Sequence, residues 1–439
     1  MPMKEQSLKV AVIGAGVSGL HTARELKTQG HAVTIFEKTK KLGGTWAYDP
    51  RVEPDPLGLD PGREIVHSSL YQSLRVNLPR RLMGFLDYPF TERKDPREFP
   101  GHEEMLLYLE DFAKDFGLVE LVRFEHEVVR VERVDEVSHE WVVESRTRRS
   151  ESKEEEVEEE VFEAVVVCNG HHTEPRIAHF PGMDSWPGVQ IHSHNYRTPE
   201  PFQNLIVVVI GNGSSAVDIL TEISSVAKEV HQALRASDIH FKKLESHNNI
   251  WQHSMVECTK EDGKVVFQDG SFVYADVIMH CTGYKYHVPF LRTNGIVSVD
   301  DNRVGPLYKH VFPPQLAPWL SFVGLPYRGV TTLIIELQSR WVARVLSGKV
   351  ALPSEEEMAS SVEELYQHME ESGWPKRHTH QLQNKFDYED WLITQILDLP
   401  PLEEWREQMY FSALKKIISI DDDDFRDTWD IDKWMQEIA

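Results

Sequence analysis

The 439-residue sequence has no long hydrophobic run, so proteins that cross a membrane are the first class to be excluded. Its longest apolar stretch, near Leu205–Ile210, is far shorter than the ~20 residues that a membrane-spanning helix needs. The first residues also lack the basic start, apolar segment and small-residue cleavage site of a secretory signal. We therefore expect no membrane association and a cytoplasmic location.

Cysteine and positive charge are also scarce. The three cysteines, Cys168, Cys258 and Cys281, lie far apart and form no C-x-x-C pair, which argues against a disulfide framework, a dithiol redox enzyme and a tetrahedral zinc site. We expect no metal. Lys and Arg number 47 against 71 Asp and Glu, and the resulting formal charge of −24 disfavours nucleic acid and anionic lipid as partners.

One pattern occurs twice in the sequence: a β-branched run, a glycine-rich turn, a helix-favouring segment and a second apolar run. Such a unit predicts two parallel strands joined by a helix. Two copies about two hundred residues apart predict two nucleotide-binding domains of α/β fold. The segments are 9–13, 18–28 and 32–36 in the first copy, and 205–210, 214–226 and 230–234 in the second.

The first turn contains the pattern G-x-G-x-x-G, formed by Gly14, Gly16 and Gly19. The first glycine allows a tight turn, the second lets a pyrophosphate approach the backbone, and the third lets helix and strand pack closely. Glu37 follows at the end of the second strand, eighteen residues after Gly19. A carboxylate at that place accepts hydrogen bonds from ribose hydroxyls.

The second turn, GNGSSA, contains Gly211, Gly213 and Ala216, with Ser214 and Ser215 between them. At the matching strand end stands Arg235, nineteen residues after Ala216, where the first copy has a carboxylate. A guanidinium suits a ribose 2′-phosphate and therefore predicts NADPH. Asp238, close by in the sequence, would oppose that preference.

An acid at one ribose and a guanidinium at the other predict two different dinucleotides, FAD at the first site and NADPH at the second. Two such cofactors in one chain imply hydride transfer from nicotinamide to flavin. Because the sequence has no paired cysteines to accept the electrons, molecular oxygen is the leading candidate for the acceptor.

Four segments carry a resemblance to a known family: KLGGTW at 41–46, RVNLPRRLMGFLDYPF at 75–90, WPGVQIHSHNY at 186–196 and CTGY at 281–284. Together they resemble the flavin-containing monooxygenases. The third segment matches the family's F-x-G-x-x-x-H-x-x-x-Y signature, with Trp186 in place of phenylalanine. The sequence in and around these segments is most similar to the plant S-oxygenating branch, whose members oxidise methylthioalkyl glucosinolates or S-alkenyl cysteines.

This resemblance implies two Rossmann-like domains, with the NADPH domain inserted into the FAD domain. The expected boundaries are 1–175 and 290–439 for the FAD domain and 176–289 for the NADPH domain. It implies that NADPH reduces FAD, that oxygen adds at flavin C4a, and that a small thioether takes the distal oxygen to become a sulfoxide. The partners are thus the thioether and O₂, and the sequence gives no indication of an oligomeric state.

The resemblance also assigns residues to the site. Asn77 matches the family's active-site asparagine, whose amide donates a hydrogen bond to the peroxide oxygen or to bound NADP⁺. An asparagine before Leu-Pro is also an ordinary turn residue. The predicted cofactor-binding residues are Gly14, Gly16, Gly19, Glu37, Lys38, Gly44, Thr45, Trp46, Gly211, Gly213, Ser214, Ser215, Ala216, Arg235, Thr282 and Gly283.

Other residues receive structural predictions. His192 and Tyr196 are expected to link the domains, and Cys168 and Cys281 to be buried fillers. Gln338 and Arg340 are placed before a helix that starts near Trp341, in a position that could bring them to the flavin ring. The start of the glutamate-rich stretch 151–163 is predicted to be a solvated hairpin extension, and the acidic end 421–439 to pack its aromatic residues on the body.

Two alternative functions remain open. One is N-hydroxylation or oxidative decarboxylation of a keto acid by a related flavin monooxygenase. The other is a catalytically inactive protein that binds FAD and NADP and acts as a partner, for which the acidic segments would be contact surfaces.

Overall fold

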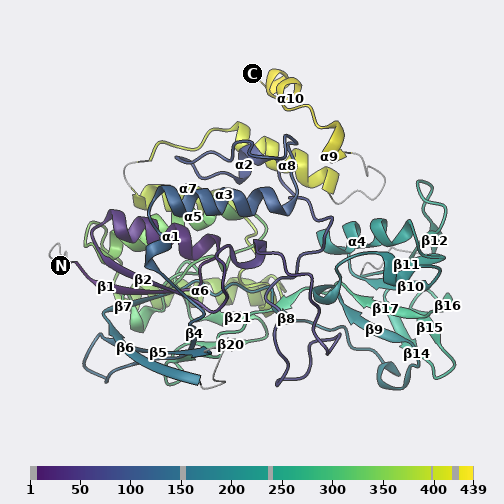
Figure 1. The fold of residues 1–439 in the computed structure, drawn as a ribbon, viewed down its shortest axis with the longest axis horizontal. Helices are drawn as coiled ribbons and strands as arrows, with labels where there is room; N and C mark the ends of the chain where they lie inside the picture. Colours follow the sequence, from purple (N-terminus) through teal and green to yellow (C-terminus); the bar gives the residue numbers. More distant parts are fainter. Residues whose placement is uncertain (1–6, 149–154, 236–240, 397–398, 418–424, 439) are drawn as a thin grey trace.

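The computed structural model describes residues 7–148, 155–235, 241–396, 399–417 and 425–438, and two parallel sheets dominate it. Figure 1 shows the two sheets side by side, with the strands of the first at the left and those of the second at the right. Each sheet begins with one of the two repeated units that the sequence predicts.

The first sheet has the order β22-β7-β1-β2-β3, and all of its neighbours pair in parallel. Its strands are β1 (Lys9–Ile13), β2 (Ala32–Glu37), β3 (Val122–Phe124), β7 (Ala164–Val167) and β22 (Leu320–Phe322). Parallel neighbours need crossovers, and α1 (Val17–Thr28) is the crossover from β1 to β2. Since β22 comes from the far end of the chain, both ends of the sequence build this sheet.

Alternation along β1 assigns its side chains to two different cores. Val10 and Val12 are fully buried among helices, whereas Ala11 and Ile13 pack in a separate cluster with Trp141. Successive side chains of a strand point to opposite faces, so a strand that is apolar at every position is buried on both sides. The four residues VAVI, from Val10 to Ile13, have this composition and are all buried.

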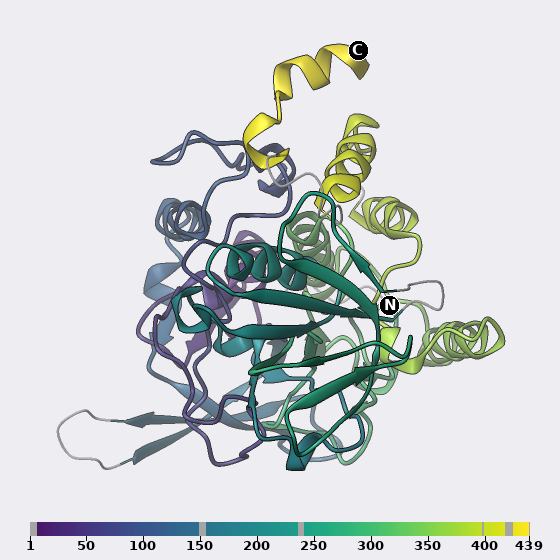
Figure 2. The same ribbon diagram turned by 90° about the vertical axis from the view of Figure 1, so that its right-hand side faces the viewer.

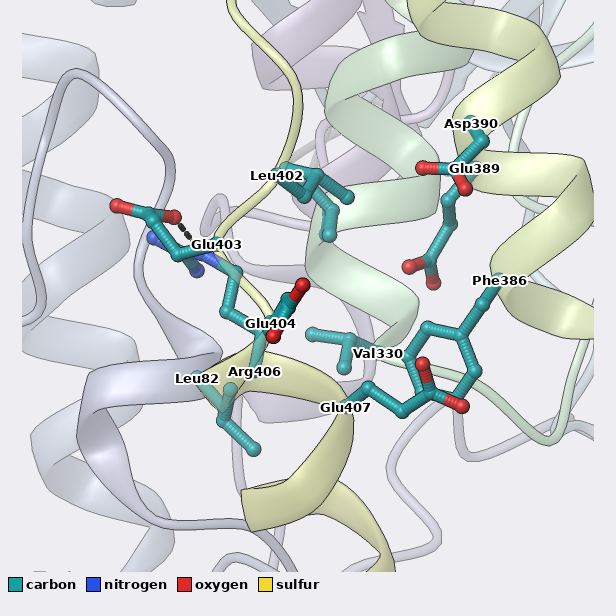
Figure 3. Close-up of a pocket in the computed structure, with 11 residues that line it drawn as sticks. Leu82, Val330, Phe386, Glu389, Asp390, Leu402, Glu403, Glu404, Arg406 and Glu407 are labelled. Atoms are coloured by element: carbon teal, nitrogen blue, oxygen red, sulfur yellow. Dashed lines mark hydrogen bonds and ion pairs between the residues drawn. The ribbon is translucent and has the colours of Figure 1, made fainter. Parts of the chain in front are cut away.

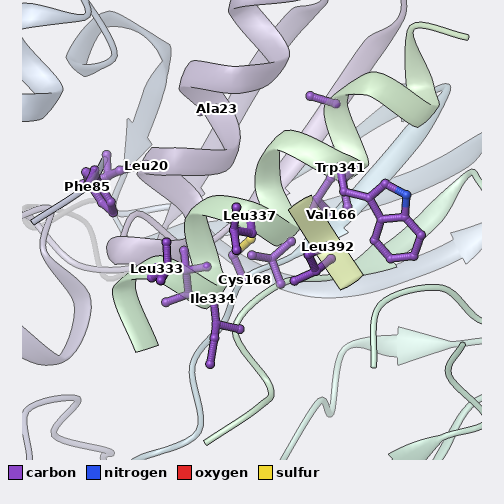
Figure 4. Packing of buried hydrophobic residues seen from close by; sticks show 14 of the residues in the cluster. Leu20, Ala23, Phe85, Val166, Cys168, Leu333, Ile334, Leu337, Trp341 and Leu392 are labelled. Atoms are coloured by element: carbon purple, nitrogen blue, oxygen red, sulfur yellow. The ribbon is translucent and has the colours of Figure 1, made fainter. Parts of the chain in front are cut away.

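Helices cover the face of the first sheet to which Val10 and Val12 point (Figure 1). They are α1, α2 (Arg80–Met83), α3 (His102–Asp115), α5 (Thr331–Leu346), α7 (Lys385–Ile396) and α8 (Trp405–Ile417). In Figure 4, Leu333 and Leu337 of α5 lie near Cys168, with Leu20 and Ala23 of α1 close by. A further helix, α6 (Glu355–Glu371), adds Met358 and Val362 to the same core.

An antiparallel layer covers the other face. Its strands are β4 (Glu127–Arg133), β5 (Trp141–Arg148) and β6 (Glu155–Phe162), and β19 (Leu291–Arg292) pairs with β4 in parallel. Figure 2 shows the β5–β6 hairpin projecting from the body. The side chains of 156–159 are exposed, as a solvated hairpin requires, whereas Phe162 at the end of β6 is buried; residues 149–154 lie outside the described residues.

The second sheet has the order β12-β13-β11-β10-β17-β9, with only β12 antiparallel to its neighbour. The strands are β9 (Val189–His192), β10 (Ile206–Ile210), β11 (Glu229–Leu234), β12 (Lys242–Lys243), β13 (Ile250–Ser254) and β17 (Val277–His280). The crossover helix is α4 (Ser214–Ser224). Val207 and Val209 face its side, and Val208 and Ile210 face the small sheet described next.

That small sheet consists of β14 (Val256–Thr259), β15 (Lys264–Phe267) and β16 (Phe272–Tyr274). The predicted hairpin around Gly270 is confirmed, because β15 and β16 pair antiparallel on either side of it. Both halves of the molecule thus have the same three layers: helices, parallel sheet, antiparallel sheet.

The chain passes between the two halves twice, and the two passages pair with each other. β8 (Glu174–Pro175), on the way into the second sheet, pairs antiparallel with β18 (Tyr284–Lys285) on the way out. Because every strand of the second sheet lies between these passages, the predicted insertion of one Rossmann-like domain into the other is confirmed. The boundaries 1–175, 176–289 and 290–439 stay a prediction.

The remaining elements are short or lie at the end of the chain. They are β20 (Ser298–Asp300), β21 (Arg303–Gly305), α9 (Phe425–Thr428) and α10 (Ile431–Ile438). Phe425 is buried and its ring meets that of Phe99 edge-on at 5.4 Å. Trp429 also contacts Phe99, so the predicted aromatic packing of the acidic end is confirmed for its described part.

Candidate active site

The first glycine turn, at the carboxyl end of β1, has no room for a Cβ at its first and third glycines. Gly14 has φ +107°, and a Cβ there would lie 2.6 Å from the carbonyl oxygen of Cys168. A Cβ on Gly19 would lie 1.8 Å from the oxygen of Gly14. The helix α1 that follows has no side-chain cap and no acidic residue in its first turn, so its free N–H groups suit a phosphate.

Glu37 ends β2 next to this turn and is buried. One carboxylate oxygen accepts a hydrogen bond from the Ala15 amide at 3.0 Å, and the other accepts two from Thr39 at 2.7 and 2.8 Å. Each carboxylate oxygen has two lone pairs, so capacity for a ribose hydroxyl is left. Glu37 therefore also holds the turn, a role that its sequence position does not reveal. Burial lowers the pKa of the neighbouring Lys38.

The KLGGTW segment folds back onto the same turn. The Gly43 amide donates to the Ala15 carbonyl at 2.9 Å. A Cβ on Gly44 would lie 2.9 Å from Cα of Gly16. Gly44 to Trp46 form a single 3₁₀ turn there, so the structure brings Gly44, Thr45 and Trp46 to the first glycine turn, as the prediction requires.

The second glycine turn repeats this construction at the carboxyl end of β10. Gly211 has φ +136°, and a Cβ there would lie 2.4 Å from the Cys281 oxygen, whereas a Cβ on Gly213 would meet no atom within 4 Å. Ser214 and Ser215 begin α4, whose first turn has no side-chain cap and no acidic residue, while Ala216 is buried. The residues of this turn therefore fit a second dinucleotide phosphate.

Arg235 directly follows β11, is exposed, and makes no hydrogen bond or ion pair with any residue that the structure describes. Burial and Arg377 lower the pKa of Arg176, Asp301 raises it, and Arg235 lowers it to a smaller extent, so Arg235 and Arg377 both lie near Arg176. Such a group of positive charges is suited to an anion. Asp238 lies outside the described residues.

Thr282 and Gly283 follow β17 and are used in joining the two halves. The Thr282 hydroxyl donates to the Arg176 carbonyl, and the Gly283 carbonyl accepts from the Arg176 amide at 2.9 Å. His192 Nε2 lies 3.0 Å from the same Gly283 oxygen, and the His192 amide donates to the Pro56 carbonyl at 2.9 Å. These contacts agree with the linking role predicted for His192.

Tyr196, the other predicted linker, stands on α4's side of the junction. Its hydroxyl donates to Glu222 of α4 at 2.7 Å, and its ring meets that of Tyr71 at 5.6 Å. Tyr71 in turn donates to Asp218 of α4 at 2.7 Å. A loop before Asn77 and the second nucleotide-binding helix are thereby tied together.

Asn77 lies on the same loop, exposed, after the buried Val76. Its side-chain oxygen accepts a hydrogen bond from Arg426 Nη2 at 3.1 Å. Arg426 also donates to Asp218, with Nη1 to Oδ1 at 3.1 Å. Sequence reasoning did not find Asp218 or Arg426, because nothing in the sequence relates a residue of the acidic end to an asparagine that precedes it by 349 positions.

The predicted position of Gln338 and Arg340 before the helix α5 is wrong, whereas their closeness to the flavin ring stays a prediction. Gln338 and Arg340 lie inside this helix, which begins ten residues before Trp341, at Thr331. The buried Gln338 amide bonds the Gly324 amide and the Tyr388 hydroxyl, and Arg340 pairs with Glu336 at 2.7 Å. The polar groups of both side chains are therefore occupied by protein partners.

The buried cysteines have the predicted filler role. Burial raises the pKa of Cys168 and of Cys281 to about 12, so both remain thiols and are poor nucleophiles. Among the described residues, no group of three or more His, Cys, Asp or Glu side chains is placed to hold a metal ion. None of the described helices has the length and apolar character to cross a membrane.

A separate pocket of about 120 Å³ lies between α2, α5, α7 and α8 (Figure 3). Figure 3 shows the Glu389 side chain directed toward Phe386 and Val330, with Glu404 and Glu407 on the opposite wall. Glu389 is only 1% exposed, and neither of its oxygens has a hydrogen-bond partner of good geometry among the described residues. Burial and the neighbouring Asp390 raise its pKa to about 8.

Two glycine turns at the carboxyl edges of two parallel sheets, each opening an uncapped helix, define a protein that binds two dinucleotides, the class to which flavin- and nicotinamide-dependent oxidoreductases belong. The family model "Flavin-binding monooxygenase-like" matches residues 7–257 and 248–403. The chain belongs to this family, and the predicted class of enzyme, a flavin-containing monooxygenase, is confirmed.

Curated relatives from Arabidopsis thaliana are similar over nearly the whole chain. Flavin-containing monooxygenase FMO GS-OX-like 2 is 52% identical, with 99% of this chain and 94% of the relative covered. Flavin-containing monooxygenase FMO GS-OX5 is 54% identical, with 98% and 94% covered. The S-allyl-L-cysteine S-oxygenase of Allium sativum has the same structure with a TM-score of 0.94 at 52% identity, covering 99% of this chain and 98% of that one. The resemblance to the plant S-oxygenating branch is thus confirmed.

Proposed function

We propose that the chain is an NADPH- and O₂-dependent S-oxygenase that converts a small thioether to its sulfoxide. The observation that supports this most is the full-length likeness to the S-allyl-L-cysteine S-oxygenase. FAD would occupy the Gly14 turn and NADPH the Gly211 turn, where both glycine cradles and both uncapped helix ends fit a pyrophosphate. S-alk(en)yl cysteines and methylthioalkyl glucosinolates are the substrate types proposed.

The overall reaction balances as NADPH, a proton, O₂ and the thioether giving NADP⁺, water and the sulfoxide. Bound FAD supplies the chemistry that passes two electrons from nicotinamide to oxygen. The residues of the chain bind the two cofactors and orient the reacting groups. Gly14, Gly16 and Gly19 let one pyrophosphate approach the backbone, and Gly211 and Gly213 do so for the other.

Asn77 is assigned the catalytic role. Its amide has two N–H donors and no acidic proton, so it can hold a developing negative charge on oxygen without protonating it. Its carbonyl oxygen is already bound by Arg426, which leaves the N–H₂ group for that task. Glu37 and Arg235 would distinguish the two ribose rings, the first by accepting from hydroxyls and the second by pairing with a phosphate.

The test is an incubation of the full chain with FAD, NADPH, O₂ and S-allyl-L-cysteine, with products followed by mass spectrometry. We expect a product heavier by one oxygen atom, labelled when ¹⁸O₂ is supplied. The Asn77→Ala variant, which leaves both glycine turns intact, is expected to retain FAD and to form hydrogen peroxide in place of most of the sulfoxide.

Parallel incubations separate the alternatives. Oxidation of an amine or decarboxylation of a keto acid, with no sulfoxide from any thioether, would support the related monooxygenase reactions instead. Failure of NADPH to bleach the bound flavin without oxygen would support a catalytically inactive partner protein.

A further inference from the structure

Arg426 makes the hydrogen bond by which the described part of the acidic end reaches the predicted catalytic asparagine. We propose that Arg426 is a positioning residue that fixes the orientation of the Asn77 amide and makes it depend on the docking of the nucleotide-binding helix α4. The inference rests on the proposed function, because it gives Arg426 a task only through Asn77.

The chemistry of the two side chains determines which way the amide faces. A guanidinium has five N–H donors and no acceptor. The atom of Asn77 that faces Arg426 Nη2 at 3.1 Å must therefore be the carbonyl oxygen, and the N–H₂ group must point elsewhere. An asparagine without this partner could turn about its last torsion and present either end, since an amide is nearly symmetric in shape.

Arg426 itself is held from several sides, as a positioning residue must be. Its two terminal nitrogens donate to Asp218 of α4, at 3.1 Å to Oδ1 and, from Nη2, at 3.2 Å to Oδ2. Asp218 also accepts from the Tyr71 hydroxyl at 2.7 Å. The Arg426 side chain is only 13% exposed, so the pair with Asp218 is largely shielded from water.

The backbone of Arg426 is anchored as well. Arg75, two residues before Asn77, donates from Nη2 to the Arg426 carbonyl at 3.2 Å and from Nε to the Phe99 carbonyl at 2.7 Å. The ring of Phe425 packs on Phe99. The short helix α9 is therefore seated on the loop that carries Asn77, while its arginine reaches across to the other domain.

The consequence is a dependence between the two halves. Asp218 lies in α4, the helix that the second glycine turn opens, so the position of that helix determines where Arg426 can donate. Asn77 then has its N–H donors oriented only when α4 is in place. A charged donor on the carbonyl also polarises the amide and strengthens its N–H groups as donors.

The experiment measures NADPH oxidation without any sulfide. Without a sulfide, NADPH, a proton and O₂ give NADP⁺ and hydrogen peroxide. We expect this side reaction to be slow in the wild type and faster when a hydrogen bond at the site is lost. We expect Arg426→Met and Asn77→Ala each to raise the substrate-free rate about tenfold, the effect of losing one hydrogen bond to a charged group. The double variant is expected to be no faster than Asn77→Ala, because Arg426 acts through Asn77.

Two further variants separate positioning from general stability. Arg426→Lys keeps the charge but not the planar pair of donors, and should give an intermediate rate. Asp432→Asn removes one exposed charge of the acidic end in the first turn of α10, away from the contacts of Arg75 and Arg426, so it serves as the matched control and should retain the wild-type rate. The KM for NADPH in Arg426→Met is expected to stay within about twofold of wild type.

The outcomes are distinguishable. A wild-type rate in Arg426→Met, beside a raised rate in Asn77→Ala, would overturn this inference and leave the proposed function standing. Rates that multiply in the double variant would overturn it too. A wild-type rate in Asn77→Ala overturns both the inference and the catalytic role of Asn77, whereas absence of sulfoxide alone affects only the substrate assignment. If Arg426→Met fails to retain FAD, Asp218→Asn decides: it should raise the rate about threefold by loosening Arg426, and an unchanged rate refutes the positioning role.

Discussion

Single side chains distinguish the two dinucleotide sites, although the turns around them are built alike. Glu37 is buried and already bonds the Ala15 amide and Thr39, so it holds the turn in addition to its proposed role at a ribose. Arg235 stands at the equivalent strand end, exposed and without a polar partner among the described residues. One site therefore offers an acceptor and the other a free positive charge.

Arg235→Ala should raise the KM for NADPH roughly 30-fold while changing that for NADH less than about twofold, because only NADPH has a 2′-phosphate to lose a charged hydrogen bond. Initial-rate measurements with both nucleotides check this. Arg235→Lys, which keeps the charge, is the matched control and should lose less. An equal rise in KM for both nucleotides would contradict the assignment of Arg235 to the 2′-phosphate.

The packing of several helices around one buried acid makes the stability of the protein depend on pH. Helices α5, α7 and α8 enclose Glu389, whose pKa is about 8 because of burial and of Asp390. In the unfolded chain a glutamate titrates near 4.3. Between these two values the folded state binds more protons than the unfolded state, so stability falls as pH rises through this window.

Glu389→Gln removes this titration. Wild-type protein should lose roughly 2–3 kcal/mol of unfolding free energy between about pH 5.5 and about pH 7.5 from this group, and the variant should lose that much less. Urea unfolding at several pH values measures the difference. Asp390→Asn provides a milder comparison, since it removes only the neighbouring charge. Identical pH profiles for wild type and Glu389→Gln would contradict the predicted burial of a neutral acid.

At the scale of the whole molecule, a buried polar cluster joins the half that contains the first sheet to the half that contains the second. Glu53 accepts from His194 Nε2 at 2.9 Å, from the Val66 amide at 3.0 Å and from Arg63 Nε at 2.8 Å. Arg63 also pairs with Glu174 of β8 at 3.0 Å, at the passage between the sheets. Glu53 and His194 are fully shielded from solvent at their side chains, so this cluster is strongly sensitive to loss of one partner.

Glu53→Ala is expected to lower the free energy of unfolding by about 3–4 kcal/mol, because it leaves Arg63 and His194 buried without their acceptor. Calorimetry and denaturant unfolding check the size and show whether the two halves then melt separately. Arg51→Ala, which breaks the exposed pair with Asp49, is the control and should cost less than about 1 kcal/mol. If the Glu53 variant is as stable as that control, the cluster does not contribute to stability as predicted.

Much of the architecture could be predicted from the sequence because its signals are local. The two glycine turns, the β15–β16 hairpin and the strand ending at His280 follow from spacing within a few residues. The start of α5 could not be predicted in this way. Its first residues, TTLII, are β-branched or bulky and favour strand, but packing of Leu333 and Leu337 in the core outweighs this weak preference.

The candidate site divides along the same line. Turn chemistry depends on φ angles and close approaches within one β-α unit, so the sequence alone specified both glycine turns and the charged residue that follows or ends the second strand of each unit. Asn77 was predictable only by resemblance, and its partners Arg426 and Asp218 not at all. Three side chains from distant segments meet there because two domains and the end of the chain pack together, and that arrangement is a property of the tertiary structure, since hydrogen bonds of this kind depend on distances in space and not on separation along the chain.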